Sequence, residues 1–148
     1  MKVEIRSPKT DQEWKEYYDL RYRILREPWN QPRGSERNEG DEIGKHLALF
    51  ESGIVKAIAR LDESAPFEGQ VRFVAVEFNA QGHGFGRLIM EACEEIAKER
   101  GDTKMILHAR EVALDFYKRL DYQLIEKSHL LFGEIQHYFM EKELYKSN

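Results

Sequence analysis

Residues 81–87 form a turn with glycines at positions 82, 84 and 86, and this turn leads directly into a helical pattern that starts at Phe85. Glycine lacks a side chain, so backbone N–H groups can approach an oxyanion, and a helix start adds unpaired donors and a partial positive charge. The helix has no obvious Ser, Thr, Asp or Asn cap, and its first acidic residue is Glu91. Together these features predict a phosphate-binding turn.

Tight turns also use glycine, so the glycines alone leave an ordinary turn as the alternative. Other phosphate-binding motifs do not fit. A P-loop ends in Gly-Lys-Ser/Thr, whereas Gly86 is followed by Arg87 and Leu88. A dinucleotide fingerprint needs Gly-x-Gly-x-x-Gly and an acid about 20 residues on, and the segment from Met105 to Ala109 has no acid. A kinase glycine-rich loop would require a far longer chain.

The elements that must position this turn follow the order β-α-β-β-β-α-β-α-β-β, which predicts a mixed α/β (α+β) fold with a central mixed sheet flanked by helices. Apolar patterning predicts strands at 3–6, 46–50, 54–61, 70–78, 105–108, 122–132 and 135–144. Helices are predicted from a Thr10-x-x-Glu13 capping box to the residue before Pro28, over 84–100 and over 112–120. A length of 148 residues suits one domain, 1–148.

Residues 28–45 are polar and contain two prolines and three glycines. Loops of this length are uncommon inside compact domains. The segment is therefore either a lid or substrate loop, or a solvated connection.

The pattern as a whole resembles the GNAT superfamily of acyl-CoA-dependent N-acyltransferases. The signature Gln/Arg-x-x-Gly-x-Gly/Ala is matched by Gln81, Gly84 and Gly86, and residues 113–120 match the family's Ala-x-x-Phe-Tyr-x-x-Leu. The C-terminal segment 132–140 resembles the ElaA-like branch of the family. The resemblance covers essentially the whole chain and implies a single GNAT-like domain.

The resemblance further implies that the turn binds the pyrophosphate of coenzyme A, and that the extended pantetheine arm pairs with the strand backbone at 74–76. A backbone N–H near Val76 would stabilise the oxyanion of the thioester. The implied cofactor-binding residues are Val74, Ala75, Val76, Gln81, Gly82, His83, Gly84, Phe85, Gly86 and Arg87. Acetyl-CoA is then the acyl donor. No metal is expected, because His46, His83 and His137 lack metal-ligand spacing.

Tyr117 is the predicted general acid, because a phenol of pKa ~10 can protonate a departing thiolate whose thiol has a pKa of ~8.5. The alternative is that Tyr117 only fills an apolar stripe beside Phe116. An amine acceptor must also lose a proton before it attacks. The eligible general bases are Glu68, Glu77, His108, Glu134 and His137. The ElaA-like pattern favours Glu134 and His137.

The leading hypothesis is an N-acetyltransferase that moves acetyl from acetyl-CoA to a primary amine, on a small molecule or a protein, by direct attack. A non-catalytic acyl-CoA-binding module and a phosphate-ligand binder unrelated to coenzyme A are the alternatives. Arg110 departs from the Asn or Gln that the family often has there, which changes the wall beside the pantetheine.

The composition of the chain limits the classes of partner that can be expected. With 23 basic and 27 acidic residues the net charge is −4, which does not predict a nucleic-acid partner. The chain has no run of about 18 apolar residues, and its N-terminus alternates apolar and charged residues, unlike a signal peptide. Cys93 is the single cysteine, which excludes an intrachain disulfide. We therefore expect a cytoplasmic protein with no membrane partner, and a homodimer is compatible with the sequence.

Overall fold

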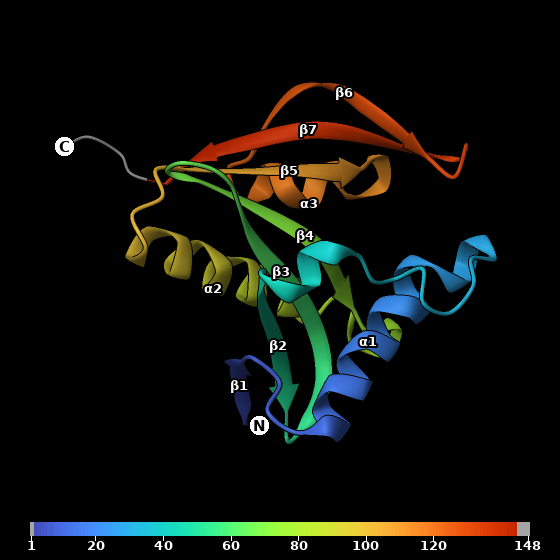
Figure 1. The fold of residues 1–148 in the computed structure, drawn as a ribbon. Helices are drawn as coiled ribbons and strands as arrows, with labels where there is room; N and C mark the ends of the chain where they lie inside the picture. Colours follow the sequence, from blue (N-terminus) through green and yellow to red (C-terminus); the bar gives the residue numbers. More distant parts are fainter. Residues whose placement is uncertain (1, 145–148) are drawn as a thin grey trace.

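Seven strands form one sheet in the computed structural model, which describes residues 2–144 (Figure 1). The strands are β1 (Val3–Arg6), β2 (Lys45–Glu51), β3 (Ile54–Ala65), β4 (Glu68–Val76), β5 (Lys104–Arg110), β6 (Gln123–Leu131) and β7 (Ile135–Glu143). The helices are α1 (Asp11–Leu25), α2 (Phe85–Glu99) and α3 (Leu114–Arg119), with short 3₁₀ turns at Glu27–Trp29, Glu39–Glu42, Phe78–Ala80 and Glu111–Ala113. The predicted element order and mixed fold class are confirmed. The prediction of one domain over 1–148 stays a prediction.

The strand order is β1-β2-β3-β4-β5-β7-β6, and only β4 and β5 run parallel. These two strands pair over three residues each, 68–70 with 104–106, and then diverge (Figure 1). A bulge helps β4 to turn away, because its register with β3 shifts between Ile58 and Arg60 and Phe73 has a positive φ of 56°. The sheet is therefore open between β4 and β5.

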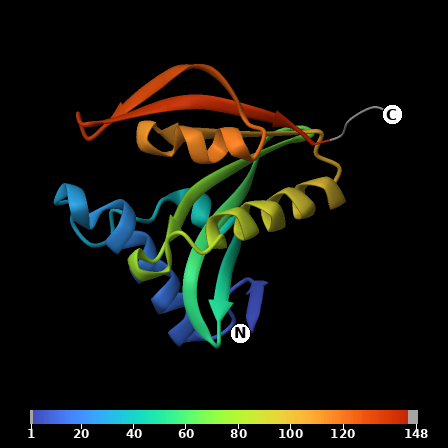
Figure 2. The same cartoon turned by 180° about the vertical axis from the view of Figure 1, so that it is seen from behind.

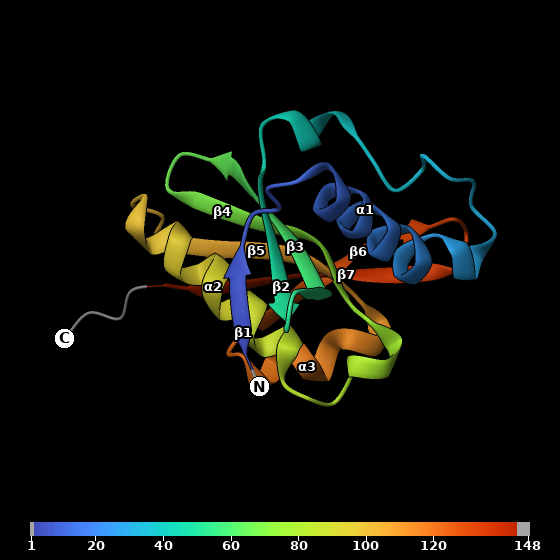
Figure 3. The same cartoon turned by 90° about the horizontal axis from the view of Figure 1, so that it is seen from below.

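Helices cover both faces of the central strands, with α2 and α1 on opposite sides (Figure 3). In β2, Leu47 and Leu49 pack in the cluster under α2, whereas Ala48 and Phe50 pack in the cluster under α1. Successive strand residues point to opposite faces, so a strand covered on both sides is apolar at every position. This explains why the predicted strand at 46–50 has no polar alternation. Viewed from behind, α3 lies along β5 beside α2 (Figure 2).

The capping box that opens α1 is confirmed. The Thr10 side chain accepts a hydrogen bond from the Glu13 N–H at 3.1 Å, and the Glu13 carboxylate accepts one from the Thr10 N–H at 3.4 Å. Arg6 donates two hydrogen bonds of 2.9 Å to the same carboxylate, which lowers the pKa of Glu13 to about 2. This local cluster joins the edge strand β1 to the start of α1.

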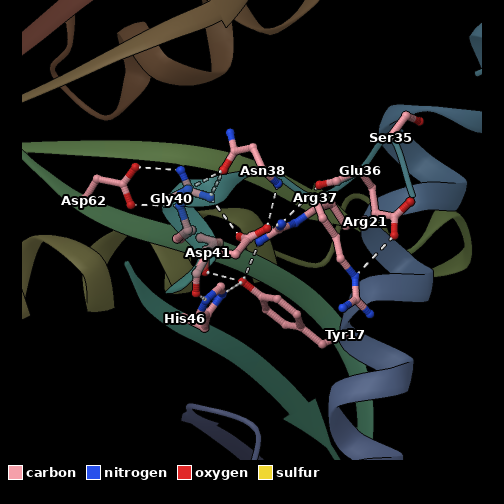
Figure 4. A network of polar contacts seen from close by, with 12 residues as sticks. Tyr17, Arg21, Ser35, Glu36, Arg37, Asn38, Gly40, Asp41, His46 and Asp62 are labelled. Carbon is pink, nitrogen blue, oxygen red and sulfur yellow. Dashed lines mark hydrogen bonds and ion pairs between the residues drawn. The ribbon is translucent and has the colours of Figure 1, made fainter. Parts of the chain in front are cut away.

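Most residues of the long segment 28–45 are exposed, but a buried ion network holds the segment to the core through Asp41 (Figure 4). Asp41 Oδ1 accepts hydrogen bonds of 2.8 Å from Arg21 on α1 and from Arg60 on β3. Both arginine side chains are fully buried. Asp62 pairs with the other side of the Arg60 guanidinium at 2.7 Å.

We expect Asp41→Asn to lower the free energy of unfolding by about 3–5 kcal/mol, because it leaves buried guanidinium charge without its shared counter-ion. Asp19 is a matched control, because it also bridges two arginines, Arg23 and Arg33, but at the surface. Asp19→Asn should cost about 0–1 kcal/mol. Urea denaturation of both variants measures the difference, and equal costs would contradict the role given to burial.

The contribution of Asp41 to stability should also depend on pH. Burial alone would raise the pKa of Asp41, but hydrogen bonds from Arg21 and Arg60 outweigh burial and lower it below 3.8. A carboxyl with a lowered folded-state pKa stabilises the protein fully above its ordinary value, and the contribution is lost as the pH falls through the folded value. The stability gap between the wild type and Asp41→Asn should therefore shrink in acid below pH 3.8.

Candidate active site

Two adjoining pockets open where β4 and β5 separate. The first, which we call the turn pocket, has a volume of about 460 Å³ and lies between the turn 81–87, the end of β4 and α3. The second, the cleft pocket, has a volume of about 430 Å³ and lies between β4, β5 and the β6–β7 hairpin. Val74, Arg110, Ala113 and Tyr117 line both, so these residues mark the junction.

Most of the predicted cofactor-binding residues line the turn pocket. They are Val74, Ala75, Val76, Gln81, Gly82, Gly84, Phe85, Gly86 and Arg87. His83 does not line this pocket, and its ring lies against that of Phe85 with 5.9 Å between centroids. The turn and the strand end, separated in sequence by the Phe78–Ala80 3₁₀ turn, therefore form one surface.

Glycine occupies positions 82, 84 and 86 of the turn for different structural reasons. Gly82 and Gly84 have φ angles of 86° and 81°, a region that side chains disfavour. Gly84 is the N-cap of α2 and offers no side-chain cap, and the first turn of α2 contains no acid. Gly86 is favoured by close packing instead, because a Cβ there would lie 3.0 Å from the Phe116 ring.

The start of α2 presents backbone N–H groups at positions 85–87 that have no acceptor within the helix, because the first helical bond is donated by Leu88 to Gly84 at 3.1 Å. Arg87 and Arg119 add positive charge to the same pocket. Glu91, one helical turn further on, pairs with Arg87 at 3.4 Å, whereas Arg119 forms no ion pair within residues 2–144. Unpaired N–H donors together with these cations suit a phosphate.

The end of β4 has one free edge. Ala75 and Val76 pair with β3 on one side, but β4 has no β5 partner beyond Gln70. Its backbone groups therefore face the opening between the strands. An extended ligand that bears amides can pair with such an edge as an added strand.

Tyr117 stands at the junction of the two pockets. The residue is 8% exposed, and its hydroxyl makes no hydrogen bond with any residue in 2–144. The ring packs edge-on against Phe116 and Tyr122. Burial raises the pKa of Tyr117, so the phenol stays protonated at neutral pH. The hydroxyl is thus a proton donor open to a ligand.

His137 lies in the wall of the cleft pocket and is buried. Its Nδ1 is 2.9 Å from the Ile135 carbonyl oxygen, which can only accept, so Nδ1 carries the hydrogen and Nε2 is left as an acceptor. Burial lowers the pKa of His137, and the charges of His129, Arg110 and His108 lower it further. The neutral imidazole is therefore the favoured form at pH 7.

The other predicted bases are placed less favourably. Glu134 is exposed in the β6–β7 turn and lines neither pocket. Glu77 binds Arg23 through two hydrogen bonds of 2.8 and 3.0 Å, which lowers its pKa, and Glu68 faces Lys104. His108 lines the cleft pocket. The structure thus brings together Tyr117, His137 and His108, and it does not bring Glu134 to them.

The cleft pocket also contains residues that the sequence did not single out, among them Arg26, Trp29 and Arg72. Arg26 follows α1, and Trp29 ends the next 3₁₀ turn, within the segment 28–45. Arg26 and Trp29 stand two residues before and one residue after Pro28, near the end of the predicted amphipathic helix. No local pattern, however, places them opposite β5.

A mixed sheet in which a strand leads through a glycine-rich turn into a helix agrees with the fold that the sequence predicted. Residues 14–122 match the acetyltransferase (GNAT) family. The chain belongs to this family.

Individual proteins are similar to this chain over nearly its full length. The uncharacterised N-acetyltransferase YjcF of Bacillus subtilis is 24% identical over 135 residues, 91% of this chain and 96% of YjcF. Among solved structures, an aminoglycoside 6′-N-acetyltransferase complexed with coenzyme A has a TM-score of 0.83 at 13% identity, covering 100% of this chain and 99% of the other. Escherichia coli ElaA has a TM-score of 0.79 at 18% identity, covering 96% and 99%. These structures share the fold.

Two further findings concern residues 2–144. None of their helices combines the length and apolarity needed to cross a membrane. They also contain no group of three or more His, Cys, Asp or Glu side chains placed to hold a metal ion.

Proposed function

We propose that this protein transfers an acetyl group from acetyl-CoA to the amine of an acceptor. The observation that carries the proposal is the meeting of two pockets at Tyr117, one with the features of a phosphate site and one open to a second substrate. Membership of the acetyltransferase family supports it. A protein of the same fold was solved with coenzyme A bound.

The chain's own groups suit coenzyme A. The N–H groups at the start of α2 would bind the pyrophosphate, with Arg87 and Arg119 as nearby cations. The free edge of β4 at 74–76 would hydrogen-bond the pantetheine amides. The thioester would then lie at the junction beside Tyr117.

The proposed reaction is direct attack. Nε2 of His137 accepts a proton from the acceptor ammonium group, and the amine nitrogen attacks the thioester carbonyl carbon. A backbone N–H near Val76 stabilises the oxyanion. As the carbon–sulfur bond breaks, the Tyr117 hydroxyl gives its proton to the departing thiolate. The attacking nitrogen loses its second proton, which restores the Tyr117 hydroxyl, and the products are an acetamide, free CoA and the proton held by His137.

The donor site is tested by Gly84→Asp against Gly84→Asn. Both side chains have open space around the Cβ and tolerate the positive φ of Gly84 better than other residues do. They are nearly equal in size, and only the Asp side chain carries a negative charge. At a ligand concentration of 100 times Kd, binding adds about 2.7 kcal/mol of stability. We expect acetyl-CoA to raise the Tm of the wild type and of Gly84→Asn, and to have no such effect on Gly84→Asp, because its carboxylate repels the pyrophosphate.

A folded Gly84→Asp protein that keeps the full shift would overturn the phosphate site. Equal stabilisation by simple nucleotides would favour a phosphate binder unrelated to coenzyme A. Release of CoA with a panel of amines separates an enzyme from a non-catalytic acyl-CoA-binding module. The panel includes small molecules and peptides, since either class of amine is compatible with the proposal.

A further inference from the structure

The arginines of this protein divide into two groups. Eight of the twelve form an ion pair with Asp or Glu: Arg6, Arg21, Arg23, Arg33, Arg37, Arg60, Arg87 and Arg100. The other four, Arg26, Arg72, Arg110 and Arg119, form no ion pair within residues 2–144, and all four line the turn pocket or the cleft pocket. Unpaired guanidinium groups are thus confined to the candidate site.

The cleft pocket concentrates this positive charge. Arg26, Arg72 and Arg110 line it, together with three histidines, and its lining contains no Asp or Glu. A cleft lined by charge of one sign focuses the electrostatic potential and attracts ligands of the opposite sign. The pocket that would receive the acceptor therefore favours an anion.

Arg110 is the member nearest to the proposed chemistry. It lies directly opposite His137 in the pairing of β5 with β7, and it lines both pockets beside Tyr117. Its guanidinium carbon is 5.8 Å from the centre of the Trp29 ring. Burial lowers the pKa of Arg110, and among residues 2–144 no carboxylate makes an ion pair that would offset this cost.

The two other arginines of the cleft pocket, Arg26 and Arg72, have acidic residues near them but form no ion pair with those residues. Arg26 is fixed through its Nε and Nη1, which donate to the carbonyl oxygens of Ser35 and Leu25. Burial lowers the pKa of Arg26, whereas Glu36 acts on it in the opposite direction without an ion pair. Arg72 has the same relation to Asp62 and Asp41. Neither arginine is neutralised by contact.

We propose that the acceptor is a small amine that also carries an anionic group, a carboxylate or a phosphate, and that Arg110, with Arg72 and Arg26, binds this group. The inference rests on the proposed acetyl transfer. The planar guanidinium binds either anion through paired hydrogen bonds. A volume of about 430 Å³ suits a small molecule. Polycationic amines would meet charge repulsion.

Matched amines test this selectivity in an assay of CoA release. β-Alanine is compared with β-alaninamide, phosphoethanolamine with ethanolamine, and spermidine serves as a polycation, each at an equal concentration of unprotonated amine. We expect kcat/KM for the anionic member of a pair to exceed that of its neutral partner by about 10–10²-fold, the effect of a hydrogen-bonded charged group. Preference for a neutral amine or for spermidine would overturn the inference and leave acetyl transfer intact.

The variant Arg110→Gln tests whether Arg110 binds the anionic group of the acceptor. It should lower kcat/KM for the anionic amine about 10–10²-fold more than for its neutral partner, mainly through KM, and the protein should still bind acetyl-CoA. Arg33→Gln is the control, because Arg33 is an exposed arginine outside both pockets, and it should change neither amine. Loss of acetyl-CoA binding in Arg110→Gln would assign Arg110 to the donor and overturn the inference.

Calorimetry separates this inference from the proposed function. If no amine causes release of CoA, the proposal of acetyl transfer is rejected. The anion site would still be supported if β-alanine or phosphoethanolamine binds the CoA-saturated wild type. Either ligand should then bind Arg110→Gln at least 10-fold more weakly. Absence of such binding together with absence of turnover would remove both.

Discussion

Tyr117→Phe is expected to lower kcat by a factor on the order of 10²–10⁴, the usual effect of losing a positioned general acid. The loss should appear in kcat more than in KM, because the hydroxyl acts chiefly in the transition state. The ring keeps its packing against Phe116 and Tyr122, and the hydroxyl gives up no hydrogen bond within residues 2–144. Stability should therefore change little.

Tyr122→Phe is the matched control for this prediction. Its ring lies 5.9 Å from that of Tyr117, but its hydroxyl donates a hydrogen bond of 2.8 Å to the buried Glu94. Removing that hydroxyl should cost about 1–3 kcal/mol of stability and leave kcat unchanged. Steady-state kinetics and urea denaturation on both variants measure the opposed effects. A folded Tyr117→Phe enzyme with undiminished kcat would remove Tyr117 from the mechanism.

His137→Asn is expected to lower kcat by a factor on the order of 10²–10⁴ and to change the pH profile. In the wild type, burial and the charges of His129, Arg110 and His108 lower the pKa of His137 below 6.5. A base is active when unprotonated, so kcat should fall only as the pH drops through that lowered value. The Asn side chain keeps a donor for the Ile135 carbonyl but has no base at Nε2, so this acidic limb should disappear.

His108→Asn distinguishes the two histidines that were eligible as bases. Both line the cleft pocket, and burial lowers the pKa of both. If His137 is the base, the acidic limb persists in His108→Asn and is lost only in His137→Asn. The reverse pattern would assign the base to His108, and loss of the limb in Glu134→Gln would assign it to Glu134.

Local signals in the sequence determined most of the fold's components. The capping box at Thr10 and Glu13 is a contact between residues three apart, and it forms as predicted. The glycines at 82 and 84 serve a turn whose backbone angles suit few other residues. Helical and strand periodicity gave the order of the ten predicted elements, because each pattern depends on near neighbours. Membership of the family agrees with the signature read from Gln81, Gly84 and Gly86.

Element boundaries were less accurate. The strand predicted at 70–78 runs instead from Glu68 to Val76, and Phe78 begins a 3₁₀ turn. The last helix is shorter than predicted, because Glu111–Ala113 forms a 3₁₀ turn before α3. Apolar residues continue past the end of each strand or helix when the next segment is also buried, so hydrophobicity alone does not mark the end.

Only the tertiary structure decided which residues share a pocket. The separation of β4 from β5 after three paired residues depends on a bulge and on contacts between distant segments. That separation places Tyr117 and His137 in the lining of one pocket and leaves Glu134 exposed at a hairpin turn. It also brings Arg26, Arg72 and Arg110 from three segments to one acid-free wall. Periodicity reports which face of an element is buried, but not which distant element lies opposite, and that pairing sets the chemistry of this cleft.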